Sequence, residues 1–163
     1  MNFTCFFKRL VLLITFLSVG NALHAGETDN TERVSQATWG VIAAFGFKKQ
    51  IDADPICKGK AYPDFDLNQF LDAIPKDVIS HPGQREGIVK QFQSYFENID
   101  TLQLPTGKTI AVAYQEMKKG TALLLRKETE SSDVADLCQK MYSNSDSIFK
   151  TQIDSVISLT VKK

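Results

Sequence analysis

Cysteine and histidine are the residue types whose chemistry would be easiest to recognise in this sequence, and the chain holds few of them. Its 163 residues include three cysteines and two histidines, and residues 26–163 keep Cys57, Cys138 and His81. A structural zinc site takes four such ligands, and a cysteine nucleophile needs a base beside it. We interpret His81, which precedes Pro82 at a predicted helix start, as a capping or surface residue. We expect no metal ion and no other cofactor.

Two acid pairs, Asp52/Asp54 and Asp64/Asp66, offer oxygen ligands or carboxylate chemistry. Calcium needs six or more oxygens from a compact loop, and the glycine and terminal glutamate of an EF-hand are absent here. We interpret the four acids as capping and solvated residues. A hydrolase that uses carboxylates alone stays open as an alternative, because such a pair is defined by its separation in space.

Phosphate-containing ligands are disfavoured by both motif and charge. Residues 105–109 read Pro-Thr-Gly-Lys-Thr, but the first glycine of a phosphate-binding loop is missing and no apolar strand leads in. Without residues 1–25 the chain loses Lys8 and Arg9, which leaves 17 basic against 19 acidic residues. Nucleic acid binding needs a clustered basic surface. The lysines here are scattered, so we expect no nucleic acid partner.

The start of the sequence has the pattern of a secretory signal peptide. Lys8 and Arg9 close a charged stretch, residues 10–19 are an apolar run of ten, and small residues follow. A transmembrane helix needs about 20 apolar residues, and no second run of that length follows. We predict a signal peptide over residues 1–25, cleaved after Ala22 or Ala25. Residues 26–163 are then one periplasmic or secreted domain without stable membrane insertion.

Export favours a disulfide between the two cysteines that remain. Oxidising compartments convert such a pair into a disulfide, and Cys57 and Cys138 have one internal connectivity available. Two free buried thiols are the alternative. The predicted Cys57–Cys138 bond closes a loop of about 80 residues and would stabilise the fold by about 4 kcal/mol.

Apolar spacing predicts helices over most of the mature chain. Residues 109–127 are ambiguous, because Ile110, Val112 and Tyr114 also alternate as in a β-hairpin. We favour a helix there, since the segment is rich in good helix formers that are poor strand formers. The sequence therefore predicts an all-α, single-domain bundle of four to five helices with one disulfide, and an α+β fold if 109–127 is a hairpin. The predicted ranges are 31–50, 66–75, 82–99, 110–125 and 133–159.

The loop that Cys57 anchors is the candidate binding feature. It spans residues 52–66 and carries Tyr62 with Lys58 and Lys60 beside it. A tyrosine on an anchored loop loses little conformational entropy when it contacts a partner. The competing interpretation is that Tyr62 covers the core. Trp39, which points away from the apolar stripe of its helix, is a second candidate contact, or else shows that this helix is buried on two sides.

Near the second cysteine, residues 138–143 read Cys-Gln-Lys-Met-Tyr-Ser. This stretch resembles a Cys-x-x-Met-Tyr patch in the all-helical periplasmic immunity proteins that neutralise type VI amidase effectors. The resemblance implies an exported, disulfide-bearing helical bundle of similar size. It covers six of 163 residues and carries no inhibitory residue across.

These observations favour a non-enzymatic protein that acts by binding another protein, as an inhibitor or immunity-type factor. The sequence offers little catalytic equipment, and a disulfide-anchored helical scaffold suits the rigid presentation of a surface. An envelope chaperone or stress protein and a small carboxylate-based hydrolase are the alternatives. The sequence leaves the oligomeric state undetermined.

Overall fold

The computed structural model describes residues 25–76, 78–79, 83–128 and 133–160. Residues 1–24 of the predicted signal peptide, together with His81 and Pro82, lie outside it. Within the described residues the chain forms five α-helices and one short 3-10 helix, with no β-strand. The predicted all-α bundle is confirmed, and residues 109–127 are not a hairpin. The elements are α1 (Ala25–Ala53), η5 (Pro55–Cys57), α2 (Leu67–Ala73), α3 (Gln84–Glu97), α4 (Ile110–Glu128) and α5 (Val134–Thr160).

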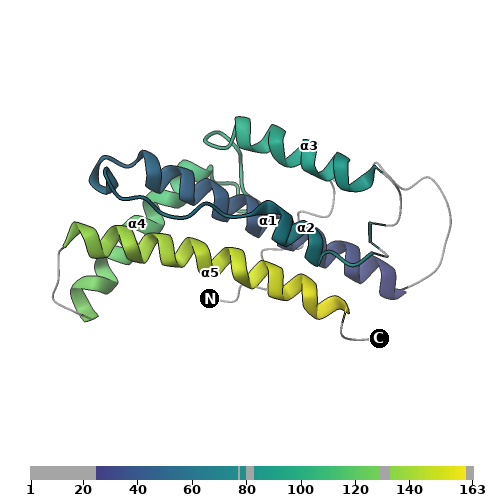
Figure 1. Ribbon diagram of the computed structural model, residues 1–163. Coiled ribbons are helices and arrows are strands. Elements are labelled where there is room, and N and C mark those ends of the chain that lie inside the picture. The colour runs from purple at the N-terminus through teal and green to yellow at the C-terminus, as the bar shows by residue number, and fades with distance from the viewer. Residues whose placement is uncertain (1–24, 77, 80–82, 129–132, 161–163) are drawn as a thin grey trace.

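The long helices α1 and α5 lie side by side and antiparallel, and the other elements pack around this pair (Figure 1). Ser158 near the end of α5 accepts a hydrogen bond from Arg33 near the start of α1 (3.4 Å). Further along, the Ser145 hydroxyl donates to the Ala44 carbonyl (2.8 Å). Helix α5 runs through the serine-rich residues 143–147 without a break, and Ser145 bonds across to α1.

The core consists of two apolar clusters that meet at Phe45 of α1. One cluster joins α1, α2, α3 and the second half of α5, and its rings include Phe70, Phe92 and Phe149. The other lies beside the disulfide, where α4 packs on α1 and α5 and Tyr114 is fully buried. The predicted enclosure of the first helix on more than one side is therefore present, since α1 contacts α3, α4 and α5.

The exposure of the side chains in α4 has the period of a helix and not that of the alternative hairpin over residues 109–127. Ile110 and Tyr114 are buried, whereas Val112 is 49% exposed. A strand would place Val112 in the same layer as the other two, so the observed pattern has the period of a helix. The helix runs through Gly120 without a break. No helix in the described residues is both long and apolar enough to cross a membrane.

Helix α1 is longer than the predicted 31–50, and α3 begins at Gln84 behind Gly83, whose φ is 93°. The predicted start of α2 is confirmed. The Asp66 carboxylate accepts a hydrogen bond from the Asn68 N–H (2.9 Å), which satisfies one of the unpaired donors of the first turn.

Candidate binding groove

The disulfide fixes the turn after α1 to the first turns of α5. Cys57 ends the short helix η5, and its sulfur bonds that of Cys138 with the two Cα atoms 5.7 Å apart. Both cysteines are buried. The predicted disulfide is confirmed, and it determines where the chain that follows must start.

Residues 58–66, which we call the connecting segment, run from the disulfide to α2 along α1 and α5 (Figure 1). The Tyr142 hydroxyl of α5 donates to the Pro63 carbonyl (3.3 Å). The Lys48 ammonium of α1 donates to Asp64 (3.0 Å), and Asp66 caps α2. The connecting segment is therefore held at its start, in its middle and at its end.

Lys48 is a buried lysine that binds two acids at once. Its side chain is 8% exposed, and its ammonium lies 2.6 Å from Asp52 and 3.0 Å from Asp64. Burial alone would lower the pKa of Lys48, but the hydrogen bonds and charges of the two carboxylates outweigh burial and raise it. Lys48 therefore stays charged and holds Asp64 of the connecting segment against α1.

Asp54 anchors η5 to α4. Its carboxylate accepts hydrogen bonds from the Tyr114 hydroxyl and the Lys118 ammonium, both at 2.6 Å, and from the Ile56 N–H at 3.1 Å. The prediction that this acid is a cap is right, because it caps η5. The prediction that it is solvated is wrong, because Asp54 is 7% exposed. The other three acids are exposed.

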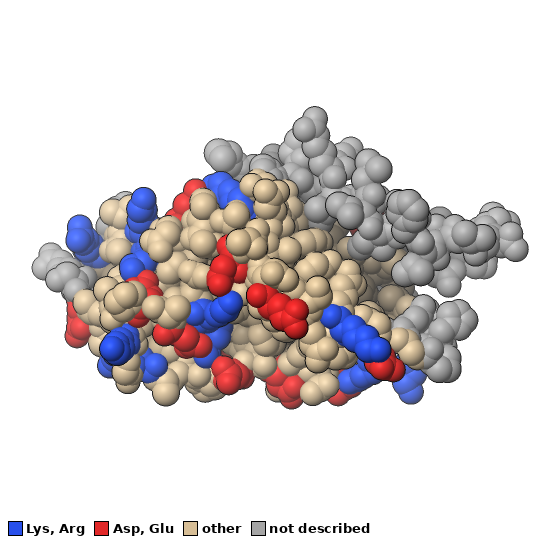
Figure 2. Space-filling model, turned by 90° about the horizontal axis from the view of Figure 1, so that it is seen from above, with Lys and Arg blue, Asp and Glu red and all other residues tan. Residues whose placement is uncertain are grey.

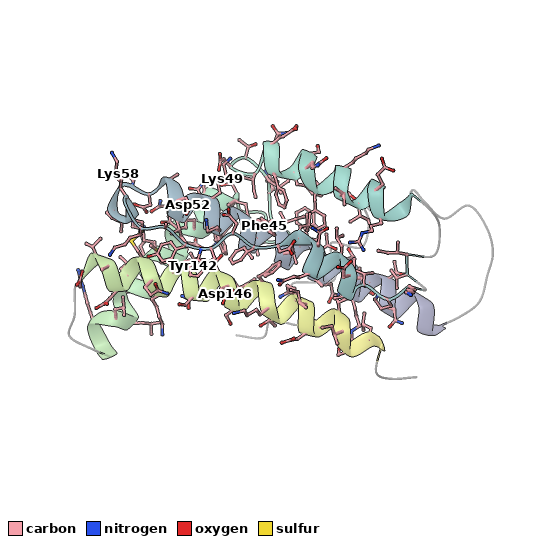
Figure 3. All side chains as sticks on the ribbon, viewed as in Figure 1. Phe45, Lys49, Asp52, Lys58, Tyr142 and Asp146 are labelled. Carbon is pink, nitrogen blue, oxygen red and sulfur yellow. A yellow bond between two sulfur atoms is a disulfide. The ribbon has the colours of Figure 1, made fainter. Side chains whose placement is uncertain are left out.

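Two tyrosines from distant parts of the sequence stack beside the connecting segment. The rings of Tyr62 and Tyr142 are 4.7 Å apart and nearly parallel, and Phe65 continues the stack towards Phe149 in the core. Figure 3 shows Tyr142 between α5 and the connecting segment. Burial raises the pKa of both tyrosines, so both hydroxyls keep their protons at neutral pH.

A groove of about 460 Å³ opens between the connecting segment and the first three turns of α5. Tyr62 and Tyr142 provide its aromatic surface. Its lining includes one carboxylate, that of Asp136 on α5, and one ammonium, that of Lys60 on the opposite wall in the connecting segment. The lining residues are Lys60, Ala61, Tyr62, Pro63, Ala135, Asp136, Gln139 and Tyr142.

Lys58 and Lys60 are exposed, and neither forms an ion pair within the described residues. Figure 3 shows Lys58 at the end of the molecule, directed away from the helices. Lys48 and Lys118 each have a carboxylate partner. Lys58 and Lys60 are therefore available to an external anion beside the groove.

Trp39 is not part of this groove. Its ring packs on Tyr95 of α3 with the ring centres 5.8 Å apart, at the contact between α1 and α3. Tyr142, Gln139 and Asp136 line the groove but were not predicted as site residues. Their spacing along α5 brings them to one face. Tyr142 also packs against the core, so the sequence alone does not distinguish a groove residue from a core residue there.

The glycine and lysine of residues 105–109 belong to a tight turn before α4. The Leu104 N–H donates to the Lys108 carbonyl (2.8 Å), and Gly107 has φ of 75°. Lys108 itself pairs with Glu116 of α4. Across the described ranges, histidine, cysteine and acidic side chains form no group suited to holding a metal ion.

Comparison with known proteins gives no relative: no family model, no curated protein and no solved structure matches the chain.

Proposed function

We propose that this chain is an exported protein that binds another protein through the groove between the connecting segment and α5, as an inhibitor or immunity-type factor. The observation that carries the proposal is the stacked pair Tyr62 and Tyr142 in a groove whose walls are fixed by a disulfide. Aromatic side chains that are already ordered provide contact area at low entropic cost. The disulfide and the signal-like start support an oxidising compartment, either periplasmic or extracellular.

The distribution of charge supports a protein partner over a nucleic acid. Figure 2 shows acidic and basic side chains interspersed on the face in view. A phosphate backbone is bound by clustered cations. Protein interfaces instead combine aromatic anchors with a few charges at the rim, which is the arrangement of Tyr62, Lys58 and Lys60 around the groove.

The groove itself lends no support to the carboxylate-based hydrolase. Such an enzyme uses two acids that face each other across the substrate. Asp136 is the one carboxylate among the residues that line the groove. Within the described residues, the groove therefore lacks the pair of facing acids that this alternative requires.

Capture from an envelope extract on tagged residues 26–163 tests the proposal. We expect one stoichiometric partner, retained by Trp39→Ala and lost with Tyr62→Ala, because Tyr62 lies in the groove and Trp39 lies at the α1–α3 contact. Circular dichroism of both variants shows whether the fold is kept.

Other results would identify the alternatives. A broad set of weakly bound clients would indicate an envelope chaperone. Turnover of peptide or peptidoglycan without a partner would indicate a hydrolase. Mass spectrometry of the exported chain tests the compartment: we expect it to start at Leu23 or Gly26, and an intact Met1 would contradict export with cleavage.

A further inference from the structure

We infer that the groove takes an extended, acidic segment of the partner polypeptide, which hydrogen-bonds to the backbone of residues 59–65. This inference rests on the proposed function and specifies the part of the partner that enters the groove. Two separate observations carry it: the unpaired backbone of the connecting segment and the unpaired charges of its lysines.

Several backbone N–H groups of the connecting segment lack a hydrogen-bond partner in the part of the chain that the structure describes, unlike the backbone groups within the helices. The Lys60 N–H donates to the Cys57 carbonyl (3.0 Å). The amides at 61–62 and 64–65 donate to no group within the described residues. The Pro63 carbonyl accepts from Tyr142, and Pro63 has no N–H to donate. The N–H groups at 61–62 and 64–65 therefore have no hydrogen-bond partner within the described residues, in a stretch that belongs to no helix or strand.

An extended peptide is the occupant that can use these donors. A strand added beside an exposed strand gains a series of main-chain hydrogen bonds, whereas a helix has already used its own backbone groups. Pro63 also favours an extended conformation at Tyr62, because the proline ring disfavours the helical region for the residue before it. Tyr62 and Pro63 are therefore expected to adopt the extended form that pairing requires.

The connecting segment is ordered before the partner arrives. Two isolated strands are marginally stable at best in water. Here one of the two is already fixed by the disulfide, by the Tyr142 hydrogen bond and by the ion pair between Lys48 and Asp64. Only the incoming segment has to lose its conformational freedom, which reduces the cost of forming the pair.

The charges indicate that the incoming segment is acidic. Within the described residues, Lys58 and Lys60 lie on the connecting segment without a carboxylate partner. Of the two acids in the same segment, Asp64 is paired with Lys48 and Asp66 caps α2. Asp136 lies on the opposite wall, on α5. An acidic side chain of the partner next to Lys60 and away from Asp136 is the complementary arrangement.

Selection from a phage-displayed library of random ten-residue peptides tests the inference on residues 26–163 with the disulfide intact. We expect enrichment of acidic peptides that bind in an extended form. Fluorescence polarisation should show that Lys58→Glu with Lys60→Glu weakens the selected peptide about tenfold at low salt. The matched control, Lys76→Glu with Lys119→Glu, changes two exposed lysines that also form no ion pair within the described residues, and should leave affinity unchanged.

Two measurements test the backbone pairing directly. N-methylation of alternate residues in the selected peptide keeps its side chains but removes its donors, and we expect affinity to fall at least tenfold for one of the two phases. Hydrogen exchange should slow at one amide of 61–62 and at one of 64–65 when the peptide binds, because neighbouring N–H groups of an extended segment point to opposite sides. Unchanged affinity in both phases, or unchanged exchange at these amides, would overturn the inference.

The two proposals can fail separately. If the envelope partner is captured in a Tyr62-dependent way but binds as a folded surface, with no acidic extended peptide selected, the inference is wrong and the proposed function stands. If neither a partner nor a peptide binds, both are wrong.

Discussion

Asp54 illustrates how one side chain can join three elements. It caps η5, and through Tyr114 and Lys118 it holds α4 against the end of α1. An aspartate directly before a proline, as in Asp54 and Pro55, is a local signal for a cap. This signal carries no information about a lysine that lies 64 positions later, so burial of the ion pair could not be predicted from local sequence.

Replacing Asp54 by Asn keeps the shape of the side chain and removes its charge, which leaves Lys118 without an anion. We expect the free energy of unfolding to fall by about 1–3 kcal/mol, less than for a fully buried pair because the Lys118 side chain is 25% exposed. Urea unfolding at pH 7 measures it. Asp66→Asn is the control, since Asn caps a helix nearly as well as Asp. Equal losses in both variants would contradict a special role for the Asp54 ion pair.

Asp54 also predicts how stability depends on pH. Burial alone would raise its pKa, but the hydrogen bonds from Lys118, Tyr114 and the Ile56 N–H outweigh burial and hold it below the ordinary 3.8. A carboxylate with a lower pKa in the folded chain stabilises it above the unfolded pKa, and this contribution is lost as pH falls through the folded value. The decline in unfolding free energy below about pH 5 should be shallower in Asp54→Asn. Parallel curves for the two proteins would argue against this linkage.

At the scale of elements, the crossing of α1 and α4 depends on a missing side chain. Gly46 of α1 faces Ile110, the first residue of α4, and a Cβ at this position would lie 2.8 Å from the Ile110 Cγ2. The sequence places a glycine within the predicted helix 31–50, where the missing side chain leaves room for a close approach. It could not indicate which element approaches, because helical periodicity specifies a buried face and not its neighbour.

We expect Gly46→Ala to destabilise the fold by about 1–3 kcal/mol, because the added methyl group overlaps Ile110. Gly120→Ala on α4 is the matched control. A Cβ there meets no atom within 4 Å, so the same substitution should stabilise the helix by about 0.5–1 kcal/mol. Thermal unfolding of the two variants gives the comparison. A stabilised Gly46→Ala would show that α4 shifts without cost.

At the scale of the whole molecule, composition and periodicity predicted the class of fold, and oxidation chemistry predicted its one covalent cross-link. The all-α bundle and the Cys57–Cys138 bond were both predictable because each follows from residue types and their spacing. The groove was only half predictable. Tyr62 lies on a loop whose anchoring cysteine marks it, but Tyr142 comes from another element and meets Tyr62 only in the folded chain.

Removing the disulfide by Cys57→Ala with Cys138→Ala should lower the free energy of unfolding by about 4 kcal/mol, because the unfolded chain regains the freedom of a loop closed across a separation of 81 residues. Chemical unfolding measures the loss. Trypsin should also cleave after Lys58 or Lys60 faster than in the wild type, since the connecting segment loses its first anchor. Cleavage at the wild-type rate would show that the remaining contacts are sufficient to hold the segment.

The position of Trp39 determines what an optical experiment on this protein can detect. It is the single tryptophan of the chain, and its half-buried ring lies against Tyr95 of α3. Tryptophan emission will therefore report whether α3 stays docked on α1, whereas the groove is formed by the connecting segment and α5. A partner could fill the groove with little change in that signal. An unfolding curve read at Trp39 can also run ahead of one read by circular dichroism if α3 detaches first.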